Sequence, residues 1–262
     1  MLWLLSSIAP AFATGPDAQY LDCDEFAGVG VVPTDAISAL VPAPFVPLSF
    51  PATDDEGNVI VDENGAPVLF LSTVVAQGGR CDEIIASGIS LHDRIFAQFG
   101  VGIVPPPGFE NGGNFYQLAF ATDHLLLALE LRSTGANARW TPFFLSYELT
   151  PTNPGEADFE LVFPRPFDFA FLLDGPVVLP DPHEAPQPVT TFNYWVQSPT
   201  DGNVVQSNVV TGIRFGEGSQ VELTAFGSSI ESIVGTDPFS FPFFSNPEIF
   251  DQADVTITTN AF

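Results

Sequence analysis

The sequence predicts a mostly β protein, a single-domain antiparallel β-barrel or cone with two or three short helices. Proline (25 residues) and glycine (22 residues) are spread through the 262 residues, which indicates many short strands joined by tight turns. Hydrophobic residues make up 45% of the chain, so it can bury a large core and global disorder is excluded. Periodicity leaves a two-sheet sandwich open as the alternative.

The N-terminal residues resemble a secretory leader. Residues 2–8 form a short apolar run, and Ala11-Phe12-Ala13 fits the small-x-small pattern of a signal-peptidase site. We therefore expect a signal peptide at residues 1–13 and one β-rich domain at residues 14–262; the alternative is a buried N-terminal strand. The apolar run is too short to cross a bilayer and no other segment is long enough, so we expect no stable membrane span.

The remaining elements follow from local patterns. Helices are expected at residues 34–40, 123–133 and 228–234; Thr34 caps the first, and Thr122 or Asp123 caps the second. The acidic stretch 54–65 carries two turn signals and predicts a small hairpin. Runs rich in β-branched and aromatic residues predict strands at 68–76, 94–104, 115–121, 138–149, 158–163, 167–173, 189–197, 204–214, 220–226 and 255–259.

The charge balance excludes several classes of function. Acidic residues number 32 against 6 basic ones, a formal charge of −26 that repels phosphate backbones, so we expect no nucleic-acid partner. All six basic residues are arginine, and the absence of lysine excludes any mechanism that needs a lysine amine. The acidity also fits a salty or acidic habitat with no particular partner.

Two cysteines, Cys23 and Cys81, are the only ones in the sequence. Secretion would favour a disulfide between them, whereas a reducing compartment would leave two free thiols. No Cys-x-x-Cys or Cys/His cluster is present, so we expect no structural metal.

Three segments resemble the acetoacetate decarboxylase superfamily across about residues 29–240. They are Leu40-Val41-Pro42-x-Pro44-Phe45 after a short helix; Asn114-Phe115-Tyr116-Gln117-Leu118-Ala119-Phe120 with the helix 123–133 and Ala136-Asn137-Ala138-Arg139-Trp140; and Gly227-Ser228-Ser229-Ile230 with Ile233-Val234-Gly235. The resemblance is one of order and spacing.

This resemblance implies a barrel or cone with a lined interior cavity. It also implies a lysine just after the central helix that forms a Schiff base with a β-keto acid. Residues 134–138 contain no lysine, and the guanidinium of nearby Arg139 is a very poor imine former. We therefore expect a relative without decarboxylase activity and without a cofactor.

Alternating side chains on the expected strands suggest an interior cavity. Arg94 and Gln98 share a face with Phe96, and Gln117 shares one with Phe115, which suits an apolar ligand with a polar or anionic end. An ordinary aromatic core with surface glutamines is the alternative. The candidate ligand contacts are the polar residues at this level of the fold: Arg94, Gln98, Gln117, Glu130 and Arg139.

Arg139 has two interpretations. It could anchor a ligand carboxylate, or it could form a structural salt bridge with Glu130 or Glu148. His124, in the first turn of the central helix, is expected to be a neutral surface residue.

Other chemistries lack their motifs. There is no Gly-x-Ser-x-Gly elbow for a hydrolase. Asp54-x-Glu56-x-Asn58 resembles a calcium loop, but Val59 stands where an EF-hand needs glycine and the final glutamate is missing.

Three functions remain open. The first is a secreted barrel that binds a small hydrophobic or amphipathic molecule, with or without a carboxylate. The second is a lysine-independent acid/base enzyme, such as a lyase, isomerase or hydratase, using for example Glu130 with His92 or Arg139. The third is a cell-surface structural or interaction protein with an exposed patch at residues 238–244.

Overall fold

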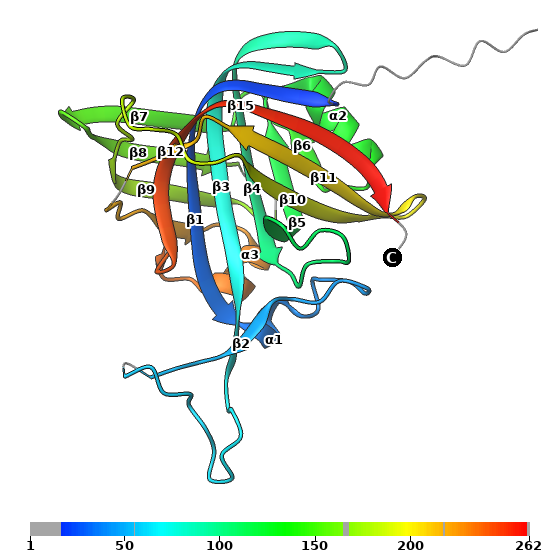
Figure 1. Ribbon diagram of the computed structural model, residues 1–262, viewed down its shortest axis with the longest axis vertical. Helices are drawn as coiled ribbons and strands as arrows, with labels where there is room; N and C mark the ends of the chain where they lie inside the picture. The colour runs from blue at the N-terminus through cyan, green and yellow to red at the C-terminus, as the bar shows by residue number, and fades with distance from the viewer. Residues whose placement is uncertain (1–16, 55, 165–167, 217, 261–262) are drawn as a thin grey trace, which may run out of the picture.

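Seven strands close into a barrel in the computed structural model, which describes residues 17–54, 56–164, 168–216 and 218–260. The expected leader, residues 1–13, lies outside the described residues. The pairing order is β1-β15-β11-β10-β5-β4-β3, and a further β1–β3 pairing closes the ring (Figure 1). The barrel strands are β1 (Ala18–Pro33), β3 (Phe70–Ala86), β4 (Ile89–Gly102), β5 (Gly113–Thr122), β10 (Thr190–Ser198), β11 (Gly202–Thr211) and β15 (Phe244–Asn260).

A second, five-stranded sheet lies beside the barrel (Figure 1). Its order is β14 (Phe239–Ser240), β13 (Glu222–Ala225), β9 (Phe171–Val178), β8 (Glu156–Phe163) and β7 (Ser146–Asn153). Three short strands extend the barrel sheet: β2 (Ser49–Pro51), β6 (Ala138–Trp140) and β12 (Arg214–Phe215). The helices are α1 (Thr34–Ile37), α2 (Leu125–Ser133) and α3 (Ser228–Val234). The predicted class, a mostly β barrel with a few short helices, is confirmed.

The larger hydrophobic core lies between the outer face of the barrel and the second sheet. Phe26 of β1 stacks on Phe159 of β8 with ring centroids 5.0 Å apart, and both rings are buried. Gly78 of β3 permits this close packing, because a Cβ there would lie 2.5 Å from Leu161 and 2.8 Å from the backbone oxygen of Phe96. The close approach of Leu161 to β3 therefore needs a residue without a side chain at position 78.

Side chains on the other face of the same strands enter the barrel. Along β1, β3 and β4 the outward residues Phe26, Ala76 and Phe99 belong to the core against the second sheet. Their neighbours Glu25, Gln77 and Gln98 line an interior chamber, as the alternation of a strand requires. Helix α2 packs Leu127 and Leu131 into a separate cluster with interior residues such as Ile84 and Phe120. The barrel interior thus has an apolar part, next to α2, and a polar part.

One pairing of the barrel differs from the antiparallel prediction. Strands β5 and β10 are parallel, and they are separated in the sequence by α2, β6 and most of the second sheet. Parallel neighbours need such a crossover connection, whereas antiparallel neighbours can be joined by a tight turn. The long insertion between these two strands is the reason for the exception.

Several predicted elements have different limits. Strand β1 was not predicted at all, and β15 begins at Phe244 although only residues 255–259 were expected. Strand β3 continues through Gly78-Gly79, and the predicted strand 138–149 is divided into β6 and β7. The excursion 52–69 forms two successive turns, with bridges Thr53↔Val59 and Val61↔Pro67, and projects from the barrel (Figure 1).

A disulfide joins Cys23 of β1 to Cys81 of β3, residues that face each other in the strand register. Free thiols, the alternative left open by the sequence, are therefore replaced by a cross-strand bridge inside the barrel. In the part of the chain that the structure describes, no helix is long and apolar enough to cross a membrane.

Candidate functional site

Two buried glutamates face each other inside the barrel. Glu25 of β1 and Glu248 of β15 are directly paired in the strand register, and each is only 4% exposed. Directly opposed residues on antiparallel strands have Cβ atoms about 4.5–5.5 Å apart, so the two carboxyls lie close together. Burying two carboxyls side by side is costly unless something compensates for their charge.

The local sequence explains how Glu25 comes to face inward. Asp22 has a left-handed φ of 49°, and the inward face of β1 changes there, because Tyr20 lies inside the barrel before it and Cys23 after it. After Asp22, Cys23 and Glu25 follow on the inner face and Phe26 takes the outer one. Glu248 follows Pro247 on β15, in the segment that pairs with residues 23–29 of β1.

A chain of side-chain amides leads to Glu25. The Gln117 amide donates to Gln98 Oε1 (2.9 Å), and the Gln98 amide donates to Gln77 Oε1 (2.8 Å). Tyr194 donates its hydroxyl hydrogen to the same Gln77 oxygen (2.7 Å), and Gln77 bonds Glu25 in turn. Because both contacts of Gln77 Oε1 are accepted ones, the Gln77 amide nitrogen is the group that donates to Glu25.

Two buried oxygens in this region have no hydrogen-bond partner. They are Glu25 Oε1 and Gln206 Oε1, which belong to side chains 4% and 6% exposed. The Gln206 amide is oriented by its donation to Asn208 Oδ1 (3.1 Å), so its oxygen is the free atom. Orphaned acceptors are rare in protein interiors, and each one suggests a missing donor.

Both orphaned residues line one interior chamber. Its free volume is about 20 Å³, enough for one water-sized group, and Glu25, Gln77, Gln98, Gln206 and Glu248 supply its polar wall. Aromatic side chains supply much of the rest: Tyr20, Phe96, Phe120, Phe192, Tyr194 and Phe250.

An apolar groove of about 290 Å³ adjoins the chamber. Gln77, Phe192, Tyr194 and Glu248 line both spaces, so they form the boundary between chamber and groove. The rest of the groove wall is apolar: Ala27, Val29, Val75, Phe115, Phe215, Phe243 and Phe244. An amphipathic molecule could place its body in the groove and its polar end in the chamber.

Burial changes the titration of the acid pair. Desolvation raises the pKa of Glu248 to about 8. It also raises the pKa of Glu25 well above its usual range, and the neighbouring Glu248 raises it further, while the hydrogen bond from Gln77 opposes the rise. Near neutral pH the pair therefore holds a proton, which is typical of groups at functional sites.

The structure brings together two of the predicted ligand contacts, Gln98 and Gln117. Both are buried, 3% and 4% exposed, and both belong to the amide chain. Gln98 lines the chamber itself, and Gln117 lines a smaller void of about 10 Å³ next to it.

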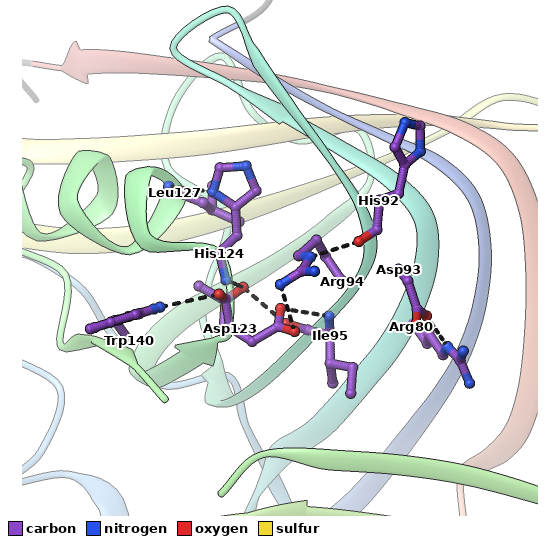
Figure 2. Close-up of polar contacts among 10 residues, drawn as sticks. Arg80, His92, Asp93, Arg94, Ile95, Asp123, His124, Leu127 and Trp140 are labelled. Atoms are coloured by element: carbon purple, nitrogen blue, oxygen red, sulfur yellow. Dashed lines mark hydrogen bonds and ion pairs between the residues drawn. The ribbon is translucent and has the colours of Figure 1, made fainter. Parts of the chain in front are cut away.

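Arg94 lies elsewhere, near the start of α2 (Figure 2). Its guanidinium donates to the backbone oxygen of His92 (2.7 Å) and pairs with the Asp123 carboxylate (3.4 Å). Asp123 also accepts from the Ile95 backbone N–H (2.9 Å), which ties the N-terminal end of α2 to β4. Arg94 therefore connects surface segments and does not line the chamber or the groove.

Glu130 and Arg139 are also outside the chamber. Glu130, half-buried on α2, accepts a hydrogen bond from Ser87 (3.3 Å), and Arg139 is exposed on β6. Neither belongs to the walls of the chamber or the groove.

The histidines differ from expectation in one case. His124 is fully buried, not a surface residue, and it caps α2 by accepting from the Leu127 N–H at Nδ1 (3.2 Å) (Figure 2). Thr122 accepts from the His124 N–H (3.1 Å) and so supports the cap without being it. His92 and Asp93 do not meet, because Asp93 pairs with Arg80 and the His92 ring approaches the Asp82 carbonyl.

The described residues do not meet the requirements of a metal site. Within residues 17–260, apart from the five positions that are not described, no group of three or more His, Cys, Asp or Glu side chains could hold a metal ion. The calcium-like turn at Asp54 is exposed, and its carboxylate accepts from the backbone N–H groups of Glu56 and Asn58.

Sequence reasoning missed the acid pair because it missed the strands that carry it. Glu25 lies in β1 and Glu248 in the first half of β15, and neither segment was assigned. A usable signal was present only for Glu248, a single acid between Pro247 and Ile249-Phe250, whereas Glu25 directly follows Asp24 and resembles a surface acid.

Comparison with models of protein families and with curated proteins finds no match. Among solved structures, the enduracididine biosynthesis enzyme MppR with HEPES buffer bound is similar, with a TM-score of 0.52 and 12% identity over 95% of this chain and 96% of that one. MppR complexed with pyruvate has a TM-score of 0.49 at 12% identity, covering 94% and 90% of the two chains. An acetoacetate decarboxylase-like enzyme from Sphingomonas wittichii RW1 has a TM-score of 0.45 at 12% identity, covering 95% and 99%.

At this level of identity the likeness shows the fold alone. The predicted resemblance to acetoacetate decarboxylase-like proteins is confirmed as a resemblance of fold. The neighbours' activities are not transferred by it.

Proposed function

We propose that this protein binds a small amphipathic molecule inside its barrel, with the polar end in the chamber and the apolar body in the groove. The observation that carries the proposal is the pair of unpartnered, buried acceptors, Glu25 Oε1 and Gln206 Oε1, on the wall of a chamber that adjoins an apolar groove. Most buried polar atoms have a hydrogen-bond partner, so two unpartnered acceptors on the wall of one chamber favour a donor bound inside it. Arg94 and Arg139 lie outside this site, so the described residues of its wall supply no cation for the carboxylate that the sequence suggested.

A thermal-shift experiment tests this proposal. Fatty acids, keto acids, terpenoids, alkyl alcohols and alkyl amines at millimolar excess should include ligands that raise the melting temperature, because a molecule that binds only the folded state stabilises it. Phe243→Ser, which opens the groove wall, should reduce the shift. Phe143→Ser, at an 86% exposed position outside the groove, is the matched control and should not. No shift with any of these compounds would refute the proposal.

Decarboxylation through an imine is not part of this function. The sequence has no lysine, so no side-chain amine is available to attack a keto acid. Purified protein should produce no acetone from acetoacetate above the uncatalysed rate, and measurable production would contradict this part of the proposal.

A lysine-independent acid/base enzyme is the second candidate, favoured by the paired carboxyls Glu25 and Glu248. A proton shared by two carboxyls can be delivered to, or removed from, a bound carbonyl compound. Enzyme-dependent exchange of the α-hydrogens of an amphipathic ketone into D₂O, followed by NMR, would reveal this activity. Glu25→Gln should abolish the exchange, whereas Glu160→Gln on the solvent face of β8 should not.

We further propose that the protein is exported, with residues 1–13 removed and residues 14–262 acting as one domain. The disulfide Cys23–Cys81 supports an oxidising compartment. N-terminal sequencing of protein recovered from the periplasm or culture medium should begin at Thr14. Recovery of the intact chain from the cytosol with free thiols would contradict it.

A further inference from the structure

We propose that the polar end of the bound molecule is a primary ammonium group, so that the ligand is an amine carrying an aliphatic or aromatic body. The inference rests on the proposed function and names its ligand class. Three features of the site carry it: unpartnered acceptors, uncompensated carboxyls and the size of the chamber.

The unpartnered atoms of the chamber are acceptors. Glu25 Oε1 and Gln206 Oε1 both require a donor, and the carboxyl of Glu248 lies across from Glu25. An ammonium group offers three N–H donors and no acceptor, whereas a hydroxyl offers one donor and a carboxylate offers none. The ammonium group is the one that can supply both missing donors and also approach Glu248.

The charge of the site points the same way. Two carboxyls enter the chamber, and its wall, as lined by described residues, includes no arginine or histidine. Three arginines, Arg80, Arg94 and Arg214, pair with aspartates outside the chamber instead. A bound ammonium ion would provide a counter-charge to the negative charge of the acid pair, while a carboxylate would add to that charge.

The space and the walls fit this head group. A chamber of about 20 Å³ accepts a group the size of one water molecule, as an ammonium is, and the groove of about 290 Å³ accepts the apolar body. Aromatic rings around the chamber attract cations through their π faces. The formal charge of −26 would also favour the approach of cationic ligands over anionic ones.

The first experiment uses the unmodified protein and matched probes. 2-Phenylethylamine, 2-phenylethanol and 3-phenylpropanoate share an apolar body and differ in the head group, as do hexylamine, hexanol and hexanoate. Titration calorimetry at pH 7 should show each amine binding at least about 10-fold more tightly than its alcohol, the order of one charge-assisted hydrogen bond, and no measurable binding of the carboxylates.

The outcomes separate this inference from the proposed function. If an alcohol binds as tightly as its amine, or a carboxylate binds best, the ammonium is refuted and the small-molecule site remains. If none of the probes binds and no compound in the thermal-shift series does either, both are refuted.

Variants then test the contacts. Glu248→Gln and Glu25→Gln should each weaken amine binding by about 10- to 100-fold and leave alcohol binding within about 3-fold. Glu160→Gln makes the same charge change on the exposed face of β8 and should leave both unchanged. Gln206→Leu, which removes an acceptor without touching the acid pair, should weaken the amine by about 10-fold and serves if either glutamate variant fails to fold. Unchanged amine affinity in the folded variants would overturn the inference.

Discussion

The two faces of the barrel wall differ in the polarity of the side chains that they carry. On its outer face, strands β1, β3 and β4 bury Phe26, Ala76 and Phe99 against the second sheet in a fully apolar core. On the inner face the same strands present Glu25, Gln77 and Gln98 to a chamber. The larger apolar core thus lies outside the barrel, and part of the interior accommodates polar groups that a well-packed core would exclude.

The largest expected effect on stability comes from removing an aromatic ring on the outer face of the barrel. Phe26→Ala removes a fully buried ring stacked on Phe159, and should lower the free energy of unfolding by about 3–5 kcal/mol. Urea titration measures the change. Phe243→Ala, at a 61% exposed position, should cost less than about 1 kcal/mol. Equal losses for the two variants would contradict the placement of the main core.

Removing the disulfide tests the apolar part of the interior. The double variant Cys23→Ala/Cys81→Ala releases a cross-link that spans 58 residues and should cost about 2–4 kcal/mol. Reduction of the wild-type protein should lower its free energy of unfolding by a similar amount and therefore lower its melting temperature. A double variant as stable as wild type would show that the disulfide does not stabilise the apolar part of the barrel interior.

The acid pair predicts that stability depends on pH. The pKa of Glu248 is raised to about 8 in the folded protein, so its contribution is present below its ordinary value of 4.5 and is lost as pH rises toward 8. The free energy of unfolding should therefore fall between pH 5 and pH 8, with about 1–3 kcal/mol of the decrease due to this group.

Glu248→Gln isolates that contribution. The variant should match wild type near pH 5, exceed it near pH 8 and show a flatter profile in chemical denaturation. An unchanged slope in the variant would mean that the pH dependence comes from other carboxyls.

The smallest expected effect concerns acids on the solvent face of the second sheet. Glu148, Glu160, Asp174 and Glu222 stand opposite one another on four adjacent strands, and all are exposed. Like charges opposed in this way are destabilising, so Glu160→Gln should add about 0.2–1 kcal/mol at low salt and less in 1 M NaCl. A gain that does not depend on salt would count against a purely Coulombic origin.

Much of the architecture was predictable. The strands at β4, β5, β8 and β10 are rich in β-branched and aromatic residues bounded by turns, and their local pattern sufficed to place them. Alternation along β4 and β5 also placed Gln98 and Gln117 on interior faces, where the structure has them. The acid pair was not predictable by the same means, because the left-handed residue Asp22 changes the inward face of β1 and Pro247 argues against a strand where β15 runs.

The sequence by itself determined the class of fold, the exclusion of lysine chemistry and the pair of cysteines available for a bridge. These depend on composition and on patterns a few residues long, which one segment carries alone. Only the tertiary structure decided which polar residues share a site. Glu25 and Glu248 are 223 residues apart (248 − 25) and meet only because β15 pairs with β1. Arg94 and Arg139, which are near Gln98 and Gln117 in the sequence, lie outside the chamber, since contact between distant side chains is set by strand pairing and not by spacing.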